Sequence, residues 1–115
     1  MTKAVGPYTP VVRAGDWLVV SGQIGVRDGA LVTGGMQAEL RQALSNVRAL
    51  LDLEGVPLTS VVKTTVYLHH IDDYAAMNET YTEFFGDHRP ARAAVAVAGL
   101  PLHALVEVEA WAFTG

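Results

Sequence analysis

The sequence of 115 residues contains no cysteine. Disulfide bonds, thiolate metal sites and cysteine nucleophiles are therefore excluded, and a reducing cytoplasm is the expected setting. Basic residues are also few. Eight lysines and arginines stand against twelve acidic residues, which gives a net charge of −4. Because nucleic acids and acidic membrane surfaces are bound by clusters of basic side chains, we expect neither kind of partner.

Long apolar runs are absent as well. No stretch reaches the roughly 20 apolar residues that span a bilayer. Residues 1–10 lack the basic and then apolar pattern of a secretion signal. Half of the residues are hydrophobic and 17% are charged, so we expect a folded core. With no linker, repeat or low-complexity stretch, residues 1–115 are predicted to form one domain.

The apolar patterning predicts an α+β fold. Apolar residues at steps of three and four predict a helix over 40–51 and a second one whose apolar stripe runs from Tyr74 to Phe85. Asp72 is available as the N-cap of the second helix, and Gly86 stands where a C-terminal glycine is usual. Runs of β-branched and aromatic residues predict strands at 11–13, 17–21, 61–69, 93–97 and 106–113. We therefore expect a five- to six-stranded mixed sheet with two helices on one face.

The last predicted strand has two different faces, because side chains alternate across a strand. One face is small and apolar, and the other mixes charges with aromatic rings: Val106, Val108, Ala110 and Ala112 against Glu107, Glu109, Trp111 and Phe113. The mixed face continues on the strand 61–69 with Lys63, Thr65, Tyr67 and His69. We expect helices over the small face and other copies of the chain against the mixed face. A solvated face with scattered aromatics is the alternative.

Metal, nucleotide and serine-nucleophile sites find little support. His69 and His70 are adjacent on a predicted strand, so their rings point to opposite faces and cannot share an ion. His88 and His103 lie in predicted loops without a partner at ligand spacing. No phosphate-binding glycine loop occurs, and Ser21 lacks the glycine pattern of a nucleophile elbow. No metal site is therefore predicted.

Arg92 is the residue that most suggests a binding site. It follows Pro90-Ala91 and opens an otherwise apolar strand, on a face shared with Ala94 and further small residues. A partly desolvated guanidinium needs an anion, and its planar fork fits a carboxylate. That anion is either an acidic side chain of the protein, with Glu107 and Glu109 as candidates, or the carboxylate of a substrate. The residues alone leave both open.

Several motifs occur in a fixed order along the chain: Gly6-Pro7-Tyr8, Val20-Ser21-Gly22-Gln23-Ile24, Gln42-Ala43-Leu44-Ser45-Asn46-Val47, Val62-Lys63-Thr64-Thr65-Val66-Tyr67-Leu68, Asn78-Glu79, Pro90-Ala91-Arg92, Leu100-Pro101 and Val106-Glu107-Val108-Glu109-Ala110. No single motif is decisive, but the set in register resembles the Rid family of reactive intermediate deaminases, also called the YjgF family. It is most similar to the RidA subgroup. The resemblance extends from Ala4 to Ala112.

The resemblance implies a chorismate-mutase-like fold of the bacillus type, in a homotrimer with a central barrel and active sites between subunits. It implies hydrolysis of reactive 2-imino acids and enamines derived from 2-aminoacrylate to 2-keto acids and ammonia, without metal or organic cofactor. The carboxylate-binding arginine falls on Arg92, and further pocket positions fall on Tyr8, Ser21, Asn78 and Glu107.

Within that implied mechanism, Glu107 would position or activate water and move a proton. A structural ion pair is the alternative role for Glu107. Backbone groups around Gly22 and Ala94 are expected to complete the pocket.

The chain also departs from the RidA pattern. Ala94 stands where many RidA relatives have cysteine, and the loop over 25–29 is short, with Gly25 in place of a common proline. These differences concern substrate range more than fold. Three other functions stay open: a pathway-specific deaminase for a 3-aminoacrylate-type substrate, a non-catalytic trimer that binds small carboxylates or keto acids, and a ribonuclease. The negative charge disfavours the ribonuclease.

Overall fold

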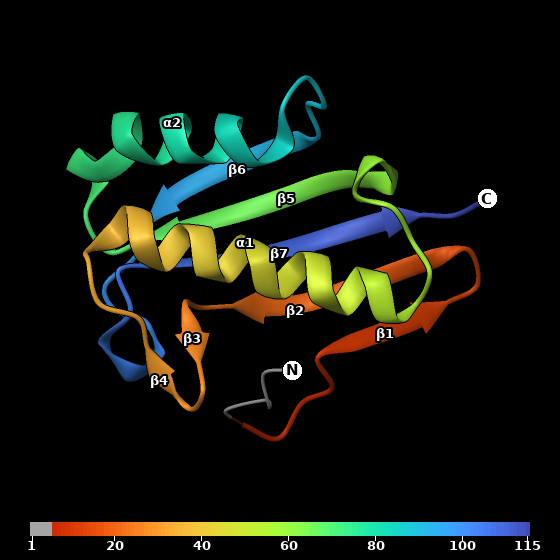
Figure 1. Cartoon of the computed structure of the whole chain (residues 1–115), viewed down its shortest axis with the longest axis horizontal. Coiled ribbons are helices and arrows are strands. Elements are labelled where there is room, and N and C mark those ends of the chain that lie inside the picture. Colours follow the sequence, from red (N-terminus) through yellow and green to blue (C-terminus); the bar gives the residue numbers. More distant parts are fainter. Residues whose placement is uncertain (1–5) are drawn as a thin grey trace.

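A five-stranded sheet carries both helices on one face (Figure 1). The computed structural model describes residues 6–115, so the first five residues of the predicted domain lie outside the described residues. The elements follow one another as β1 (Val11–Ala14), β2 (Trp17–Gln23), β3 (Val26–Arg27), β4 (Ala30–Leu31), α1 (Met36–Leu53), β5 (Val61–Leu68), α2 (Tyr74–Phe85), β6 (Ala91–Ala96) and β7 (Val106–Phe113).

The strand order in the sheet is β1-β2-β7-β5-β6. All neighbours are antiparallel except β5 and β6, which are parallel and joined through α2. The short strands β3 and β4 pair in a separate hairpin. The expected mixed α+β sheet with two helices on one face is therefore confirmed, with five strands in the main sheet. β6 is an edge strand, which matters for the site described below.

The small apolar face of β7 lies under the helices, as expected. Its side chains at Val106, Val108, Ala110 and Ala112 are completely buried. They pack in one core with apolar residues of both helices, among them Leu44 of α1 and Met77 of α2. Neither α1 nor α2 covers the other face of the sheet, which we call the open face (Figure 1). Strand alternation therefore predicted which β7 side chains are available for chemistry.

The start of α2 differs from the expectation. The helix begins at Tyr74 after a 3₁₀ turn over Ile71–Asp73, and Asp73 occupies the cap position without a capping side-chain hydrogen bond. Asp72 as the N-cap was therefore wrong. The tight turn already uses the Asp73 N–H, which donates to the His70 carbonyl at 3.1 Å. Gly86 is confirmed at the helix end, with a φ of 64° that favours glycine.

Gly25 is the point where the chain leaving β2 passes α1. A Cβ atom at this position would lie 2.6 Å from both the Cα and the carbonyl oxygen of Glu39. The same loop is tied to α1 by Asn46, whose Nδ2 donates to the Ile24 and Val26 carbonyls at 3.2 and 3.0 Å. Because backbone atoms on both sides resist displacement, an added methyl group must strain the contact.

We therefore expect Gly25→Ala to lower the free energy of unfolding by about 1–3 kcal/mol. Thermal unfolding at fixed protein concentration, followed by circular dichroism, measures the change. Gly99→Ala is the matched control, because a Cβ atom there meets nothing within 4 Å. Equal midpoints for the two variants would show that the Gly25 contact is not tight.

Candidate active site

A cleft of about 410 Å³ opens beside β2 and β7. Four of the residues predicted for the site line it together, namely Tyr8, Ser21, Gly22 and Glu107. They come from three parts of the chain: the segment before β1, the end of β2 and the open face of β7. Residues far apart in sequence therefore meet in one concave surface of a size suited to a small molecule.

The end of β2 shapes one wall of the cleft. The pairing of β2 with β7 is irregular between Val20 and Gln23, so Ser21 and Gly22 lie outside the regular ladder. Ser21 binds the preceding segment twice: its N–H donates to the Pro10 carbonyl at 2.8 Å, and its hydroxyl donates to the Thr9 carbonyl at 2.6 Å. Ser21 therefore fixes the segment that carries Tyr8.

Gly22 lies directly against the Glu107 side chain. A Cβ atom at Gly22 would lie 2.7 Å from Glu107 Cδ and 2.8 Å from its Oε2. The absence of a side chain at Gly22 thus leaves the space that the carboxyl group occupies. Since the end of a glutamate side chain is flexible, an alanine here displaces the carboxyl group without disturbing the backbone.

For this reason Gly22→Ala is expected to lower the kcat of any reaction that uses Glu107 by about 10- to 100-fold, with the fold retained. Steady-state kinetics and circular dichroism on the same preparation separate these two effects. Gly99→Ala is again the control. An unchanged kcat in the folded variant would argue against a part for Glu107 in the reaction.

The cleft has an acidic wall. Burial raises the pKa of Glu107, and the negative charge of Glu109 raises it further. The Tyr67 hydroxyl donates a hydrogen bond of 2.6 Å to Glu109 Oε1. That hydrogen bond, with burial and the nearby negative charges, raises the pKa of Tyr67 to about 12. A carboxyl group with a raised pKa is a stronger base than an ordinary one and is suited to take up a proton in a reaction.

Arg92 lies elsewhere in the chain. β6 pairs with β5 so that Arg92 is beside Thr64, a residue buried under the helices. The guanidinium accordingly contacts α2: Nη2 donates to the Tyr74 hydroxyl at 3.1 Å, and the guanidinium carbon lies 4.9 Å from the centroid of the Tyr81 ring. Nη1 lies 3.6 Å from the Met77 sulfur. All these contacts are made to neutral groups.

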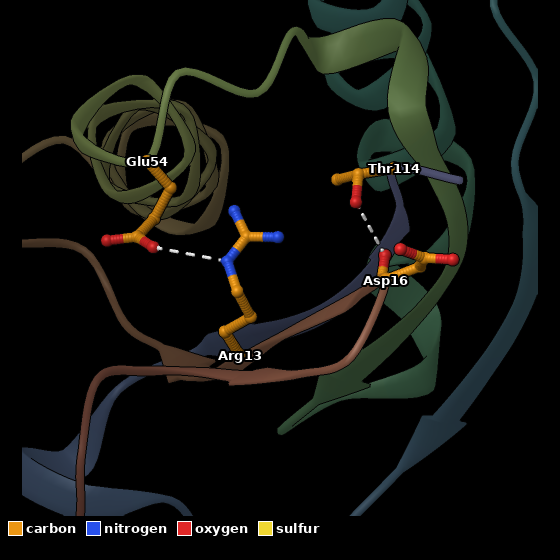
Figure 2. Close-up of polar contacts among 4 residues, drawn as sticks. All are labelled: Arg13, Asp16, Glu54 and Thr114. Carbon is orange, nitrogen blue, oxygen red and sulfur yellow. Dashed lines mark hydrogen bonds and ion pairs between the residues drawn. The ribbon is translucent and has the colours of Figure 1, made fainter.

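No acidic side chain among the described residues forms an ion pair with Arg92. Over residues 6–115, the ion pair within 4 Å joins Arg13 Nε to Glu54 Oε1 at 3.9 Å (Figure 2). An ion pair between Arg92 and Glu107 or Glu109 was one of the two expectations, and within one chain it is wrong. The register places Arg92 on the helix side of the sheet and both glutamates on the open face.

Asn78 and Ala94 belong to the Arg92 group. Asn78 lies one helical turn after Tyr74 on α2, so both side chains share a helix face. Its Oδ1 atom is buried, and within residues 6–115 it has no hydrogen-bond partner. Ala94 follows Arg92 on the same face of β6 and packs against the core. The expected pocket around Gly22 and Ala94 is therefore split in one chain.

In a single chain, the residues predicted for the site thus fall into two separate groups, which we call the cleft half and the arginine half. The cleft half comprises Tyr8, Ser21, Gly22 and Glu107, and the arginine half comprises Asn78, Arg92 and Ala94. Tyr67 and Tyr74 were not predicted as site residues, and Glu109 was considered only as an ion-pair partner of Arg92. Tyr74 in particular was expected on the core stripe of its helix, but its side chain is 42% exposed and contacts Arg92.

A second hollow of about 450 Å³ shares Pro101 with the cleft. His69 and His103 are in its wall. In the described part of the chain, no group of three or more His, Cys, Asp or Glu side chains is arranged to hold a metal ion. Neither helix of this part combines the length and the apolar character needed to cross a membrane.

The sequence of the chain matches a known protein family. The model of the family described as Endoribonuclease L-PSP matches residues 1–114. The 2-iminobutanoate/2-iminopropanoate deaminase of Homo sapiens is 44% identical over 114 residues, which cover 97% of this chain and 83% of that protein. A RutC family protein of Pyrococcus horikoshii is 43% identical over 113 residues, which cover 96% of this chain and 90% of that protein.

A solved structure supports the same assignment. The YjgF gene product of E. coli is 38% identical, with a TM-score of 0.91, and the match covers 97% of this chain and 91% of that one. Both the sequence match and the fold match extend over nearly the whole chain, so the resemblance to YjgF and RidA proteins is confirmed. The chain therefore belongs to the Endoribonuclease L-PSP family, the family of the YjgF and RidA proteins.

Proposed function

We propose that this protein hydrolyses 2-imino acids, and the enamines in equilibrium with them, to 2-keto acids and ammonia. The observation that carries the proposal is the Arg92 guanidinium, which is half-buried and, among residues 6–115, contacts neutral groups only. Such a cation favours a bound carboxylate, which its planar fork receives through two hydrogen bonds. The name of the human relative, 2-iminobutanoate/2-iminopropanoate deaminase, supports the substrate class.

The proposed site forms between copies of the chain in a homotrimer. Arg92 and Glu107 lie on opposite sides of the sheet, so the arginine half of one copy needs the cleft half of another. An aromatic cluster on the open face supports such packing. The ring centroid of Trp17 lies 6.1 Å from that of Trp111 and 4.9 Å from that of Phe113, and all three side chains remain more than a third exposed.

In the proposed reaction, the arginine half binds the substrate and the cleft half transfers protons. Arg92 binds the substrate carboxylate and so orients C2 of the protonated imine, which is electrophilic without a metal ion. Glu107 takes a proton as water adds to C2, which gives a tetrahedral carbinolamine. The proton then moves from Glu107 to the nitrogen and the C–N bond breaks, so that ammonia leaves. Glu107 takes the hydroxyl proton as the C2–O bond becomes a carbonyl, and this proton passes to the departing ammonia or to water. Asn78, whose buried Oδ1 has no hydrogen-bond partner within residues 6–115, is proposed to line the arginine half beside the substrate.

The test is release of ammonia and 2-keto acid from freshly generated 2-iminobutanoate and 2-iminopropanoate. We expect the protein to accelerate hydrolysis well above the rate in buffer. If it binds 2-ketobutanoate but does not accelerate the reaction, the protein is a carboxylate binder and the proposed activity is wrong. Acceleration confined to a 3-aminoacrylate-type substrate would replace the substrate class and leave the two half-sites in place.

A further inference from the structure

The acidic wall of the cleft contains two groups that the proposed reaction does not use, Tyr67 of β5 and Glu109 of β7. The antiparallel register places Tyr67 directly opposite Glu107, and Thr65 opposite Glu109. The Tyr67 hydroxyl therefore crosses the ladder diagonally to reach Glu109 Oε1 at 2.6 Å. This hydrogen bond holds the Glu109 carboxylate on the cleft side, two residues from Glu107.

The charge of Glu109 is not neutralised by the nearest cation on the open face. Lys63 is on the same face of β5, but its Nζ donates to Thr65 Oγ1 at 2.9 Å and to the Thr64 carbonyl at 3.1 Å. No ion pair between Lys63 and Glu109 occurs in the described residues. Among the described residues, no cation is therefore paired with the Glu109 carboxylate beside Glu107.

Few other titratable side chains lie near Glu107 and Glu109. His69, which follows the end of β5, lines the second hollow rather than the cleft, and the segment before β1 contributes Tyr8. The wall formed by β2 is neutral, with Ser21 and Gln23. In the proposed trimer, Arg92 of a second copy also faces the cleft. Glu109 is thus the acidic residue closest to Glu107 along β7, and its carboxylate is held in place by Tyr67. The negative charge of this carboxylate raises the pKa of Glu107.

We propose that Tyr67 and Glu109 are positioning residues for Glu107: the tyrosine hydroxyl fixes the Glu109 carboxylate, and the fixed negative charge makes Glu107 a stronger base. This inference rests on the proposed function, in which Glu107 accepts the proton of water. Tyr67 suits the task because its hydroxyl remains protonated, and therefore a donor, throughout the pH range in which the enzyme would work. Neither residue needs to touch the substrate.

Two variants separate the charge from the hydrogen bond. Glu109→Gln keeps the size of the side chain and an oxygen acceptor for Tyr67 but removes the charge, so the acidic limb of the kcat/KM profile is expected to move to lower pH. Tyr67→Phe keeps the ring and removes the donor, so kcat is expected to fall about tenfold with KM unchanged. Glu83→Gln, an exposed glutamate of α2, is the matched control with the same loss of charge.

A titration of the Glu107 carboxyl group by NMR in the ligand-free protein gives a readout that does not depend on turnover. We expect its midpoint to fall in Glu109→Gln and to stay unchanged in Glu83→Gln. An unchanged midpoint in Glu109→Gln overturns the inference, whether or not the protein hydrolyses imines. A lowered midpoint in a protein that shows no imine hydrolysis supports the coupling of the carboxylates and overturns the proposed function instead.

Discussion

Replacement of Arg92 by alanine is expected to lower kcat/KM for 2-iminobutanoate by about 10³-fold. The guanidinium would supply both the charge and the geometry that hold the substrate carboxylate, and the loss of a paired, hydrogen-bonded charge is among the largest single effects at a binding site. Affinity for the product 2-ketobutanoate should fall with it. Steady-state kinetics and calorimetric titration with 2-ketobutanoate measure the two effects.

The Arg92→Ala variant should still fold, because β6 is an edge strand and the side chain is only half-buried. Arg92→Lys tests the planar fork, since it keeps the charge and loses the two parallel hydrogen bonds, and it should recover only part of the activity. Arg41→Ala, an exposed arginine of α1, is the control. If Arg92→Ala turned over imines as fast as Arg41→Ala, a carboxylate-binding part for Arg92 would be excluded.

Glu107→Gln should give a different pattern. We expect kcat to fall by about 10²- to 10³-fold, the usual contribution of a positioned proton acceptor. Binding of 2-ketobutanoate should be nearly unchanged, because the arginine half is intact. Parallel kinetic and binding measurements on the variant check both statements. A large loss of binding in Glu107→Gln would mean that Glu107 holds the substrate rather than moving a proton.

The pH dependence follows from the raised pKa of Glu107. In the proposed reaction the ionised form of Glu107 is the base, so kcat/KM of the wild type should rise as the pH rises through that pKa, and Glu107→Gln should lose this limb. The free energy of unfolding should change in the opposite direction, falling as the pH rises. Between the ordinary and the raised pKa, the folded state keeps a proton that the unfolded state releases, so Glu107 makes the fold less stable as the pH rises. Urea unfolding at several pH values should show this slope in the wild type and not in the variant.

The sequence was sufficient for the fold and for the open face of β7. There the contrast between small apolar residues and large or charged ones determines which side is covered. The face of Arg92 could not be read in the same way. β6 is composed of alanines around Arg92 with one valine, and such small residues fit either face of an edge strand. Only the parallel pairing with β5 decides that Arg92 lies on the side of α2.

The polar contacts of the site required the register between strands. Tyr67 and Glu109 are 42 positions apart, and their hydrogen bond depends on a diagonal across the β5–β7 ladder that no local pattern contains. Tyr74 shows the limit of helical periodicity. It has the spacing of a core residue, but it stands at the first position of α2, where it stays exposed and its hydroxyl accepts a hydrogen bond from Arg92.

The central claim is that each active site takes Arg92 from one copy and Glu107 from another. It is tested most directly by unfolding and refolding Arg92→Ala and Glu107→Gln together in equal amounts, with mixed trimers verified by native mass spectrometry. Random assembly leaves about a quarter of the sites with both native residues, so imine hydrolysis should return to about a quarter of the wild-type rate. Mixed trimers that stay as inactive as the two parent variants would contradict the account.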